Sequence, residues 1–432
     1  MSLLQMKAFL REYLQLPRKV LVVAGGRLFN SLGSFVVILT TPLFIQHLQM
    51  SPAQAGTWLF ACSAAFLGGS LAAGAVLDRV NKVWVLGGTL ALNALAFGVG
   101  AISESSVAVP AAMVAGYFFH GAWRPSMAAI AADETTADQH AIAFSLMYFV
   151  HNIGFLVAPV AAGWLFATSP RLVHLGDAIS SLLSAAIVLL GTGTVLTARA
   201  GRSSDGANVV PAATAAVDQA IPDTGATVAP RSTGRFLPAL LRDRVLLAFI
   251  GAMVFLQLTY AQHQFALPLQ LIEEMGQVGT ARFATLMAFN AGVVIVLAPF
   301  LTALTRKMRS SAGITWAAVA QLVGFGMLAW VRGYGWYFAS VLIWTIGEIL
   351  GAIHISVFIV SRAPERMRGR YVGATPVIFS AAGMLSPFLG GWLVELAGTR
   401  AVWLVTAIMC SAAVTILLIV DRYVVTAHRN AS

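Results

Sequence analysis

One acidic residue stands in the middle of a long apolar segment, where it could do proton chemistry. Glu348 lies at the centre of 335–361, which contains no other Asp, Glu, Lys or Arg. A charge at the middle of a membrane helix costs about 2.5–3.5 kcal/mol even on a lenient insertion scale. Because burial disfavours the ionised carboxylate, we expect Glu348 to take up and release a proton. A carboxylate that is paired permanently for packing is the alternative.

Two arginines stand inside other apolar segments, and each shares a helical face with uncharged polar side chains. The two faces consist of Arg27, Asn30 and Ser34 in 20–47, and of Tyr117, His120 and Arg124 in 107–131. A polar face within lipid should line a cavity, so we expect both faces to contact a ligand. Two alternatives stay open: Arg27 could extend to the membrane interface, and Arg124 could pair with Asp133.

Further segments carry polar or aromatic side chains that fit the same cavity. They are Tyr148, His151 and Asn152 in 141–167, Gln257, Tyr260, His263 and Gln264 in 240–271, and Trp344 in 335–361, with Asn290 in 279–305 as a weaker candidate. Because imidazole titrates near pH ~6.5, we expect His151 and His120 to act with Glu348 in proton coupling, and His263 is a further candidate. For each histidine, a ring that only satisfies a neighbouring hydroxyl or carbonyl group is the alternative.

Two motifs rich in small residues complete the set of candidate residues. One is the charged loop Gly74-Ala75-Val76-Leu77-Asp78-Arg79-Val80-Asn81-Lys82 between two apolar segments, and the other is Gly154-x-x-x-Ala158-Pro159-x-x-x-Gly163. In both, the sequence resembles the major facilitator superfamily. Gly74, Asp78, Arg79 and Lys82 match the family's loop after its second helix, and Gly154, Pro159 and Gly163 match the motif of its antiporters. Asn81, Ala158 and Ala162 stand where the family usually has glycine.

The resemblance extends to other parts of the chain. Gly347-Glu348 and Arg368-Gly369-Arg370-Tyr371-Val372-Gly373 resemble features of drug:proton antiporters in this superfamily, and Arg124-Pro125 with Ala132-Asp133 resembles its fourth helix and the following loop. That loop departs from the family because it lacks the usual arginine. The resemblance implies two related six-helix bundles, a gating role for the loop motif and an antiport mechanism.

The composition is that of a membrane protein. Of 432 residues, 58% are hydrophobic and 10% are charged, whereas soluble domains have about 25% charged residues. A helix needs about 20 apolar residues to cross ~30 Å of hydrocarbon, so the length allows about a dozen spans. Cys62 and Cys410 both lie in apolar segments, which argues against a disulfide framework.

Apolar runs and polar breaks predict an all-α membrane protein of twelve transmembrane helices. The spans are 20–47, 53–77, 83–102, 107–131, 141–167, 173–197, 240–271, 279–305, 312–331, 335–361, 370–396 and 401–422. The predicted domains are a cytoplasmic amphipathic segment 1–19, a six-helix bundle 20–197, a flexible cytoplasmic linker 198–239, a second six-helix bundle 240–422 and a cytoplasmic tail 423–432. Asp177, near the outer end of its span, is expected to be solvated or structural.

The basic residues predict the orientation. With the N-terminus inside, the inner loops and tails hold 21 of the 27 Lys and Arg residues, and the outer loops hold only four. This asymmetry places both termini in the cytoplasm, and we expect a multi-pass protein of the plasma membrane, the inner membrane in a bacterium. The net charge of +10 is therefore a topology signal and a contact to anionic lipid, so no nucleic-acid partner is expected.

The two predicted halves resemble each other. Ala158-Pro159-x-x-x-Gly163-Trp164-Leu165 matches Ser386-Pro387-x-x-x-Gly391-Trp392-Leu393, and Gly154 and Gly383 precede these runs at nearly the same distance. Two related halves around a midplane site are the architecture of many secondary transporters.

These observations predict a secondary transporter that exports a small amphipathic organic compound in exchange for protons, by alternating access. Without a nucleotide loop, metal cluster or hydrolytic triad, we expect no cofactor, no metal and no enzyme activity. The expected partners are the substrate, protons and lipid, and the superfamily is usually monomeric. Trp123, Phe155, Tyr260 and Trp344 favour an amphipathic, cationic substrate, whereas Arg27 and Arg124 favour an anionic or zwitterionic one.

Two alternative functions stay open. One is proton-coupled uptake of a small metabolite, peptide or siderophore-like compound, because the direction of transport cannot be read from residues. The other is a transporter-like membrane enzyme or receptor, which should carry a carboxylate or histidine cluster at one surface. The group Asp133, Glu134, Asp138 and His140 is the nearest match, but its spacing fits no recognisable metal site.

Overall fold

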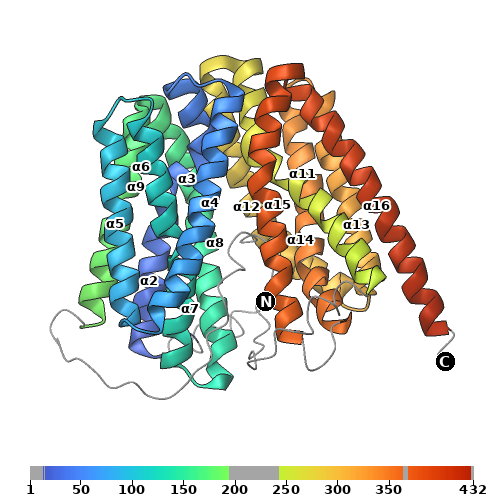
Figure 1. Ribbon diagram of the computed structural model, residues 1–432, viewed down its shortest axis with the longest axis horizontal. Helices are drawn as coiled ribbons and strands as arrows, with labels where there is room; N and C mark the ends of the chain where they lie inside the picture. The colour runs from blue at the N-terminus through green and yellow to red at the C-terminus, as the bar shows by residue number, and fades with distance from the viewer. Residues whose placement is uncertain (1–12, 14, 194–242, 363–367, 430–432) are drawn as a thin grey trace. The chain divides into compact units, whose positions relative to one another are not determined.

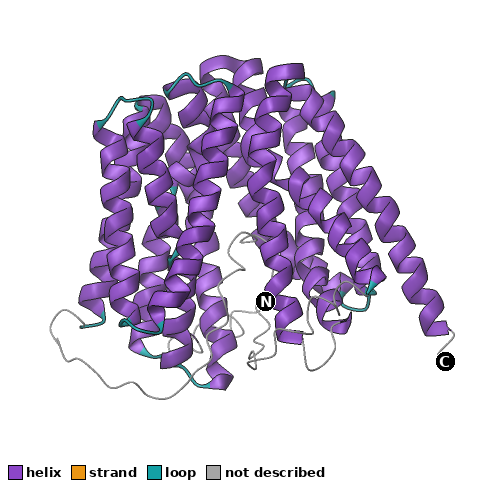
Figure 2. Cartoon of the chain, viewed as in Figure 1, coloured by secondary structure: helices purple, strands orange, loops and turns teal. Residues whose placement is uncertain are grey.

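The described residues are almost entirely helical. The computed structural model describes residues 13, 15–193, 243–362 and 368–429, and within these ranges every regular element is a helix (Figure 2). Helices are favoured because an apolar segment in lipid must satisfy its backbone groups within itself. The predicted linker 198–239 lies outside the described residues, as do most of 1–19 and the last three residues.

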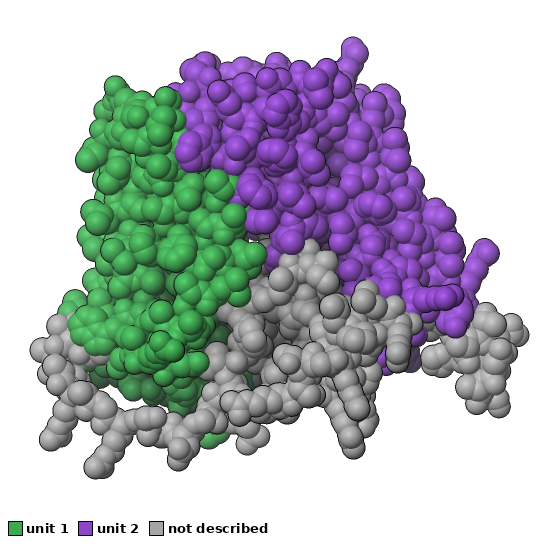
Figure 3. Space-filling view, in the orientation of Figure 1, with its two compact units in different colours: residues 1–43, 61–212, 223–227 green, residues 44–60, 213–222, 228–432 purple. Residues whose placement is uncertain are grey.

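By its contacts the chain divides into two compact units, coloured separately in Figure 3. Within the described ranges, unit 1 comprises 13–43 and 61–193, and unit 2 comprises 44–60 and 243–429. Among the described residues, unit 1 lies in the first half of the chain, and unit 2 lies in the second half except for the segment 44–60.

Unit 1 is built from helices of the first half of the chain. They are α2 (Arg18–Leu32), α3 (Phe35–Pro42), the later part of α4 (Pro52–Leu77), α5 (Lys82–Ile102), α6 (Ala108–Gly121), α7 (Trp123–Glu134), α8 (Ala137–Thr168) and α9 (Pro170–Gly191). Helix α2 packs against α8 and α9, and α5 packs against α6 and α9 (Figure 1). Val23, Leu86, Leu90, Ile130 and Val188 form part of the buried core between them.

Two of the predicted spans in unit 1 are interrupted. The sequence predicts single helices over 20–47 and 107–131, but the chain leaves the helix at Gly33–Ser34, and a second break at Ala122 separates α6 from α7. At the first break, Asp177 of α9 accepts a hydrogen bond from the N–H of Val36 at 3.0 Å. A helix start leaves backbone N–H groups without intrahelical acceptors, and the Asp177 carboxyl group is the acceptor for one of these N–H groups. Asp177 is 2% exposed, so it is structural and not solvated.

Unit 2 begins with a short segment from the first half of the chain. This segment is η1 (Leu43–His47) and the start of α4. Thr280 donates a hydrogen bond to Oε1 of Gln46 at 2.5 Å, and Glu395 accepts from Ser51 at 3.0 Å. These contacts hold the segment within unit 2.

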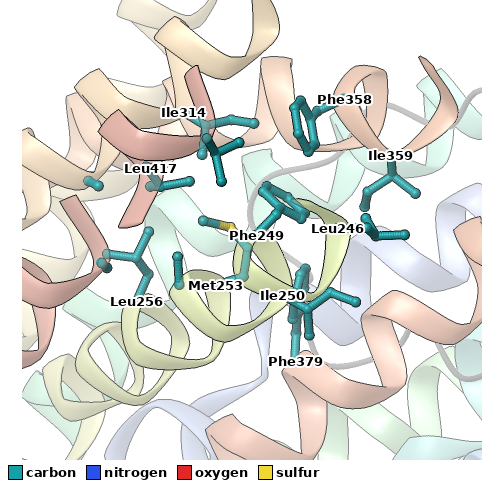
Figure 4. Packing of buried hydrophobic residues seen from close by; sticks show 14 of the residues in the cluster. Leu246, Phe249, Ile250, Met253, Leu256, Ile314, Phe358, Ile359, Phe379 and Leu417 are labelled. Carbon is teal, nitrogen blue, oxygen red and sulfur yellow. The ribbon is translucent and has the colours of Figure 1, made fainter. Parts of the chain in front are cut away.

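The rest of unit 2 consists of long helices. They are α11 (Arg244–Met275), η2 (Gly276–Val278), α12 (Gly279–Thr305), α13 (Ser310–Gly326), η3 (Met327–Ala329), α14 (Tyr334–Arg362), α15 (Arg368–Ala397) and α16 (Thr399–Arg429). Helix α11 packs against α15 and α16, and α13 packs against α14 and α16. Figure 4 shows the shared core, in which Phe249, Met253, Ile314, Phe358 and Leu417 are buried together.

The membrane-spanning segments follow from these helices. Ten segments of the described chain are long and apolar enough to cross a membrane. One of them, 244–305, contains both α11 and α12, while α6 and α7 are each too short alone and together cover the predicted fourth span. The all-helical membrane fold predicted from the sequence is confirmed.

Candidate functional site

Glu348 lies in the interior of unit 2, on α14, with a side chain that is 4% exposed. Asn290 of α12 donates its amide Nδ2 to Oε2 of Glu348 at 3.1 Å and to the hydroxyl of Thr345 at 2.8 Å. The second carboxyl oxygen, Oε1, is buried and receives no hydrogen bond from any described residue. The carboxyl group is therefore held through one oxygen, and the other remains open to a proton.

Two side chains of α11 stand beside this carboxyl group. The Tyr260 hydroxyl lies close enough to Glu348 to interact with it. The ring of His263 lies 4.5 Å from that of Tyr260, and its Nδ1 donates to the Tyr260 carbonyl at 2.5 Å. Because Nδ1 carries the hydrogen in this bond, a neutral His263 ring keeps its lone pair on Nε2. Nε2 is buried and has no partner among the described residues, so its lone pair can accept a proton.

A stack of aromatic rings packs against the part of α14 that carries Glu348. Trp344, one helical turn before Glu348, stacks on Phe325 with a centroid distance of 5.3 Å. Phe325 in turn stacks on Trp403 at 6.1 Å, and the indole N–H of Trp403 donates to Gln270 at 2.6 Å. Because the stack joins α13, α14 and α16, it restrains the face of α14 that carries the carboxyl group.

The other two predicted cavity residues of α11 do not join this group. Gln257 is partly buried and lies near Gly383 of α15. Gln264 is exposed. Of the predicted residues in unit 2, the structure therefore brings Tyr260, His263 and Trp344 together with Glu348.

In unit 1, the predicted basic residues gather around His151 of α8. Ser31 of α2 and Nδ1 of His151 are 2.9 Å apart and share a hydrogen bond. Arg27, Arg124 and His120 are near enough to act electrostatically on the same imidazole ring. These basic side chains come from α2, α6 and α7, which no sequence pattern joins.

The remaining predicted polar residues of unit 1 form hydrogen bonds inside that unit, some within one helix and some between two. The Ser34 hydroxyl donates to the carbonyl of Asn30 at 3.0 Å, at the break before α3. Tyr117 shares a hydrogen bond of 2.7 Å with Thr40.

Tyr148 and Asn152 lie one helical turn apart on α8. Tyr148 is 44% exposed, and the Asn152 side chain donates to the Tyr148 carbonyl at 2.8 Å. Both partners of this hydrogen bond therefore belong to α8.

An ion pair connects the loop motif to the end of α7. Lys82 and Asp133 are 2.5 Å apart, and Lys19 and Glu134 are 2.6 Å apart. Asp133 therefore has a lysine partner, although the following loop lacks the family's arginine. Asp78 and Arg79 are exposed, and a methyl group on Gly74 would meet no atom within 4 Å. The gating role of this motif stays a prediction.

The second motif lies at a close contact between α8 and α2. A methyl group on Gly154 would lie 2.7 Å from the carbonyl carbon of Ser31 and 2.8 Å from the nitrogen of Leu32, closer than van der Waals contact allows. Pro159 and Gly163 are buried along the same helix. Small residues at this interface let the two backbones approach.

Sequence reasoning underrated Asn290 as the partner of Glu348 and missed Thr345, which accepts a hydrogen bond from the same Asn290 amide. Thr345 lies three residues before Glu348 and therefore on the same helical face, so its spacing was a usable signal. Asn290 stands on a different helix, and only the packing of α12 against α14 brings it to the carboxyl group.

Comparisons with known proteins agree with this fold. The profile of the Major Facilitator Superfamily matches residues 23–387. The chain is 23% identical over 420 residues to the uncharacterised MFS-type transporter YttB of Bacillus subtilis (strain 168), with 96% of this chain and 98% of YttB covered. It is 23% identical over 299 residues to a Na⁺, Li⁺, K⁺/H⁺ antiporter of Planococcus maritimus, with 64% of this chain and 67% of the antiporter covered.

A solved structure has the same fold. The POT family transporter PepTSo superposes with a TM-score of 0.71 at 15% identity, covering 95% of this chain and 98% of PepTSo.

Proposed function

Because the chain belongs to the Major Facilitator Superfamily and is a membrane transporter rather than an enzyme, we propose that it exports a small amphipathic organic compound in exchange for protons. No nucleotide-binding loop was found in the sequence, so an ion gradient is the expected source of energy. Alternating access around a central site then couples the two fluxes.

The observation that carries this proposal is the environment of Glu348. A buried carboxyl group with a permanent structural role should have both oxygens satisfied, since a buried polar atom without a partner costs free energy. Glu348 has one amide donor at Oε2 and none among the described residues at Oε1. An oxygen held in this way can gain a proton without breaking an existing hydrogen bond.

The neighbouring residues provide a route for that proton. When protonated at Oε1, Glu348 gains a donor that the Tyr260 hydroxyl can accept, and the free Nε2 of His263 lies beside Tyr260. When Glu348 is ionised, the bond from Asn290 stabilises the carboxylate. The Tyr260 hydroxyl therefore has a different role in each state, as a donor to the carboxylate and as an acceptor from the protonated acid, and this difference can couple protonation to a conformational change.

The relative from Planococcus maritimus supports proton antiport and provides a second candidate substrate. That protein is named as an antiporter of Na⁺, Li⁺ and K⁺ with protons. A monovalent metal cation in place of an organic compound would need the same proton-binding carboxyl group. The two candidates differ only in the ion or molecule that moves against the proton.

The experiment uses purified protein in liposomes with an imposed pH gradient and a pH-sensitive dye inside. Lipophilic cations, amphipathic anions, NaCl and KCl are added in separate runs. We expect proton movement opposite to one of the organic compounds. Proton movement with Na⁺ or K⁺ would select the second candidate, and movement of a compound together with protons would make the protein an importer.

The Glu348→Gln variant tests the residue assignment. We expect loss of gradient-driven proton movement while exchange of labelled substrate for unlabelled substrate continues, because exchange needs no net proton transfer. Glu104→Gln is the matched control, since Glu104 is exposed and pairs with Arg171. Unchanged proton coupling in Glu348→Gln would contradict the proposal.

A further inference from the structure

The turn between α12 and α13 concentrates positive charge on the surface of unit 2. Arg306, Lys307 and Arg309 fall within four residues there, and all three side chains are exposed. Neither α12 nor α13 contains an acidic residue. The orientation predicted from the basic residues places this turn at the cytoplasmic surface of the membrane. A ligand that binds at the turn should therefore carry negative charge.

One of the three cations has an acidic partner, and the other two have none among the described residues. Arg309 lies 3.3 Å from Asp421 of α16, and Asp421 also accepts a hydrogen bond of 2.5 Å from Ser311. Arg306 and Lys307 form no ion pair within the described parts of the chain. The bonds to Asp421 hold the start of α13 against α16. The turn is therefore anchored, while two of its charges stay available to a ligand.

The corresponding loop in the first half of the chain has a different charge pattern. The loop Gly74 to Lys82 occupies the same place there, between the second and third predicted spans. It carries an acidic residue, Asp78, directly before Arg79, and both are exposed. The position before Arg306 is occupied by Thr305, which is buried and donates its hydroxyl to a backbone carbonyl group. The excess of positive charge therefore distinguishes the turn of unit 2 from the loop motif.

An exposed apolar face of α13 begins near this turn. Trp316 is 59% exposed and Val323 is 50% exposed, with the partly exposed Val319 between them. The spacing of these residues places their side chains on one face of the helix. The opposite face packs into the core of unit 2 through Ile314 and Ala318. The exposed face is therefore available to lipid chains in a membrane.

The separation between Trp316 and the turn fits the depth that tryptophan prefers in a membrane. Trp316 is seven residues after Arg309, which corresponds to about 10 Å along a helix. Indole rings gather at the boundary between headgroups and acyl chains, whereas the charged ends of arginine and lysine stay at the level of the headgroups. The turn and the indole therefore match the headgroup and the upper acyl chains of one phospholipid.

We infer that the turn Arg306–Arg309 binds the headgroup phosphate of an anionic phospholipid, whose chains lie along the Trp316 face of α13. Both an arginine and a lysine donate charge-assisted hydrogen bonds to phosphate oxygens. Clusters of basic residues beside a membrane helix attract the anionic lipids of the cytoplasmic leaflet. A free phosphate ion would not use the apolar face, so that face selects a lipid. The inference does not depend on the compound or ion that the protein transports.

Quenching of Trp316 fluorescence by brominated lipid tests the inference. Full-length protein is reconstituted in two kinds of vesicle that contain phosphatidylcholine and the same minor fraction of phosphatidylglycerol. Bromine is carried by the phosphatidylglycerol chains in one kind, and by an equal amount of phosphatidylcholine in the other. The chain has 10 tryptophans, so the Trp316 signal is the difference between the wild type and Trp316→Phe. We expect brominated phosphatidylglycerol to quench Trp316 about threefold more strongly, since two cations attract one anionic headgroup.

Two double variants and a second tryptophan connect this preference to the turn. In Arg306→Gln/Lys307→Gln, the two brominated lipids should quench Trp316 equally, because both available charges are lost. Arg306→Lys/Lys307→Arg keeps the charges and should keep the preference. Trp84 of α5 is 46% exposed and follows the loop of unit 1. Because that loop contains Asp78, Trp84 should show a much smaller preference, which is measured with Trp84→Phe.

Any of four results would overturn the inference. They are equal quenching of Trp316 by the two brominated lipids in the wild type, an unchanged preference in Arg306→Gln/Lys307→Gln, an equal preference at Trp84, and loss of the preference when glycerol 3-phosphate is added at constant ionic strength. The last result would make the turn a site for free phosphate compounds. Glu348→Gln should keep the lipid preference, so either proposal can fail while the other stands.

Discussion

Each unit buries one acidic side chain, and the two are held in opposite ways. Within the described ranges, Asp177 in unit 1 and Glu348 in unit 2 are the buried carboxyl groups. Asp177 accepts a hydrogen bond from the backbone of α3, at a point where the helix has just been interrupted. Glu348 lies in the interior of an uninterrupted helix, and one of its oxygens has no described partner.

The difference separates a structural carboxylate from one that is suited to transferring a proton. An N–H group at a helix start cannot find another acceptor once it is buried, so Asp177 is needed as a permanent hydrogen-bond acceptor. The amide of Asn290 can reach Thr345 as well as Glu348, so the partner of Glu348 stays satisfied when the carboxyl group changes state. Burial alone does not identify a functional acid; the number and kind of its donors do.

The largest expected effect comes from removing the structural carboxylate. Asp177→Ala leaves the N–H of Val36 buried without an acceptor, and we expect the free energy of unfolding to fall by about 3 kcal/mol. Glu348→Gln keeps an oxygen that can accept from Asn290, so this variant should change the free energy of unfolding by less than about 1 kcal/mol. Denaturation of both purified variants in mixed micelles measures the difference. Equal losses in the two variants would remove the distinction between the two acids.

A second prediction compares the glycines that precede the matching motifs of the two halves. The neighbours of Gly154 leave no room for a methyl group, whereas a methyl group on Gly383 would meet Gln257 Nε2 only at 3.6 Å. We expect Gly154→Ala to lower the free energy of unfolding by about 1–3 kcal/mol through overpacking. Gly383→Ala should be neutral or stabilise by up to about 1 kcal/mol, as alanine does in a helix with room for it.

The same denaturation assay tests this pair of variants. If Gly383→Ala destabilised as much as Gly154→Ala, the two motifs would share one packing role, and the asymmetry between the units would be absent at this position.

The smallest effects are expected at ion pairs near the helix ends. Lys82 pairs with Asp133 in unit 1, and Arg309 pairs with Asp421 in unit 2. Asp421 also accepts a hydrogen bond of 2.5 Å from Ser311 and is less exposed than Asp133. We expect Asp133→Asn to lower the free energy of unfolding by less than about 1 kcal/mol, which is the usual contribution of an exposed ion pair. Asp421→Asn should lower it somewhat more.

The turnover of Asp133→Asn tests the gating prediction at the same time. A loss of transport that is much larger than the loss of stability would indicate that the Lys82–Asp133 pair takes part in the conformational cycle. Transport that falls only in proportion to the amount of folded protein would make the pair a simple tether between α5 and α7.

The sequence by itself determined the fold class of this protein. Apolar segments of about 20 residues can satisfy their backbone in lipid only as helices, so the all-helical membrane fold follows from the apolar segments of the sequence. The loop at Gly74 to Lys82 was sufficient to predict the superfamily, and the depth of Glu348 in its segment was sufficient to single out that residue. These signals are local, and they depend on residue type and spacing along one helix.

Tertiary structure alone decided which polar groups meet. The breaks at Gly33–Ser34 and Ala122 carry no strong signal in the sequence, because Asp177 compensates the first from another helix and α7 restarts at once after the second. The polar groups around Glu348 and around His151 likewise come from residues far apart in the chain. Spacing along a helix shows which residues share a face, but only the packing of helices shows what that face contacts.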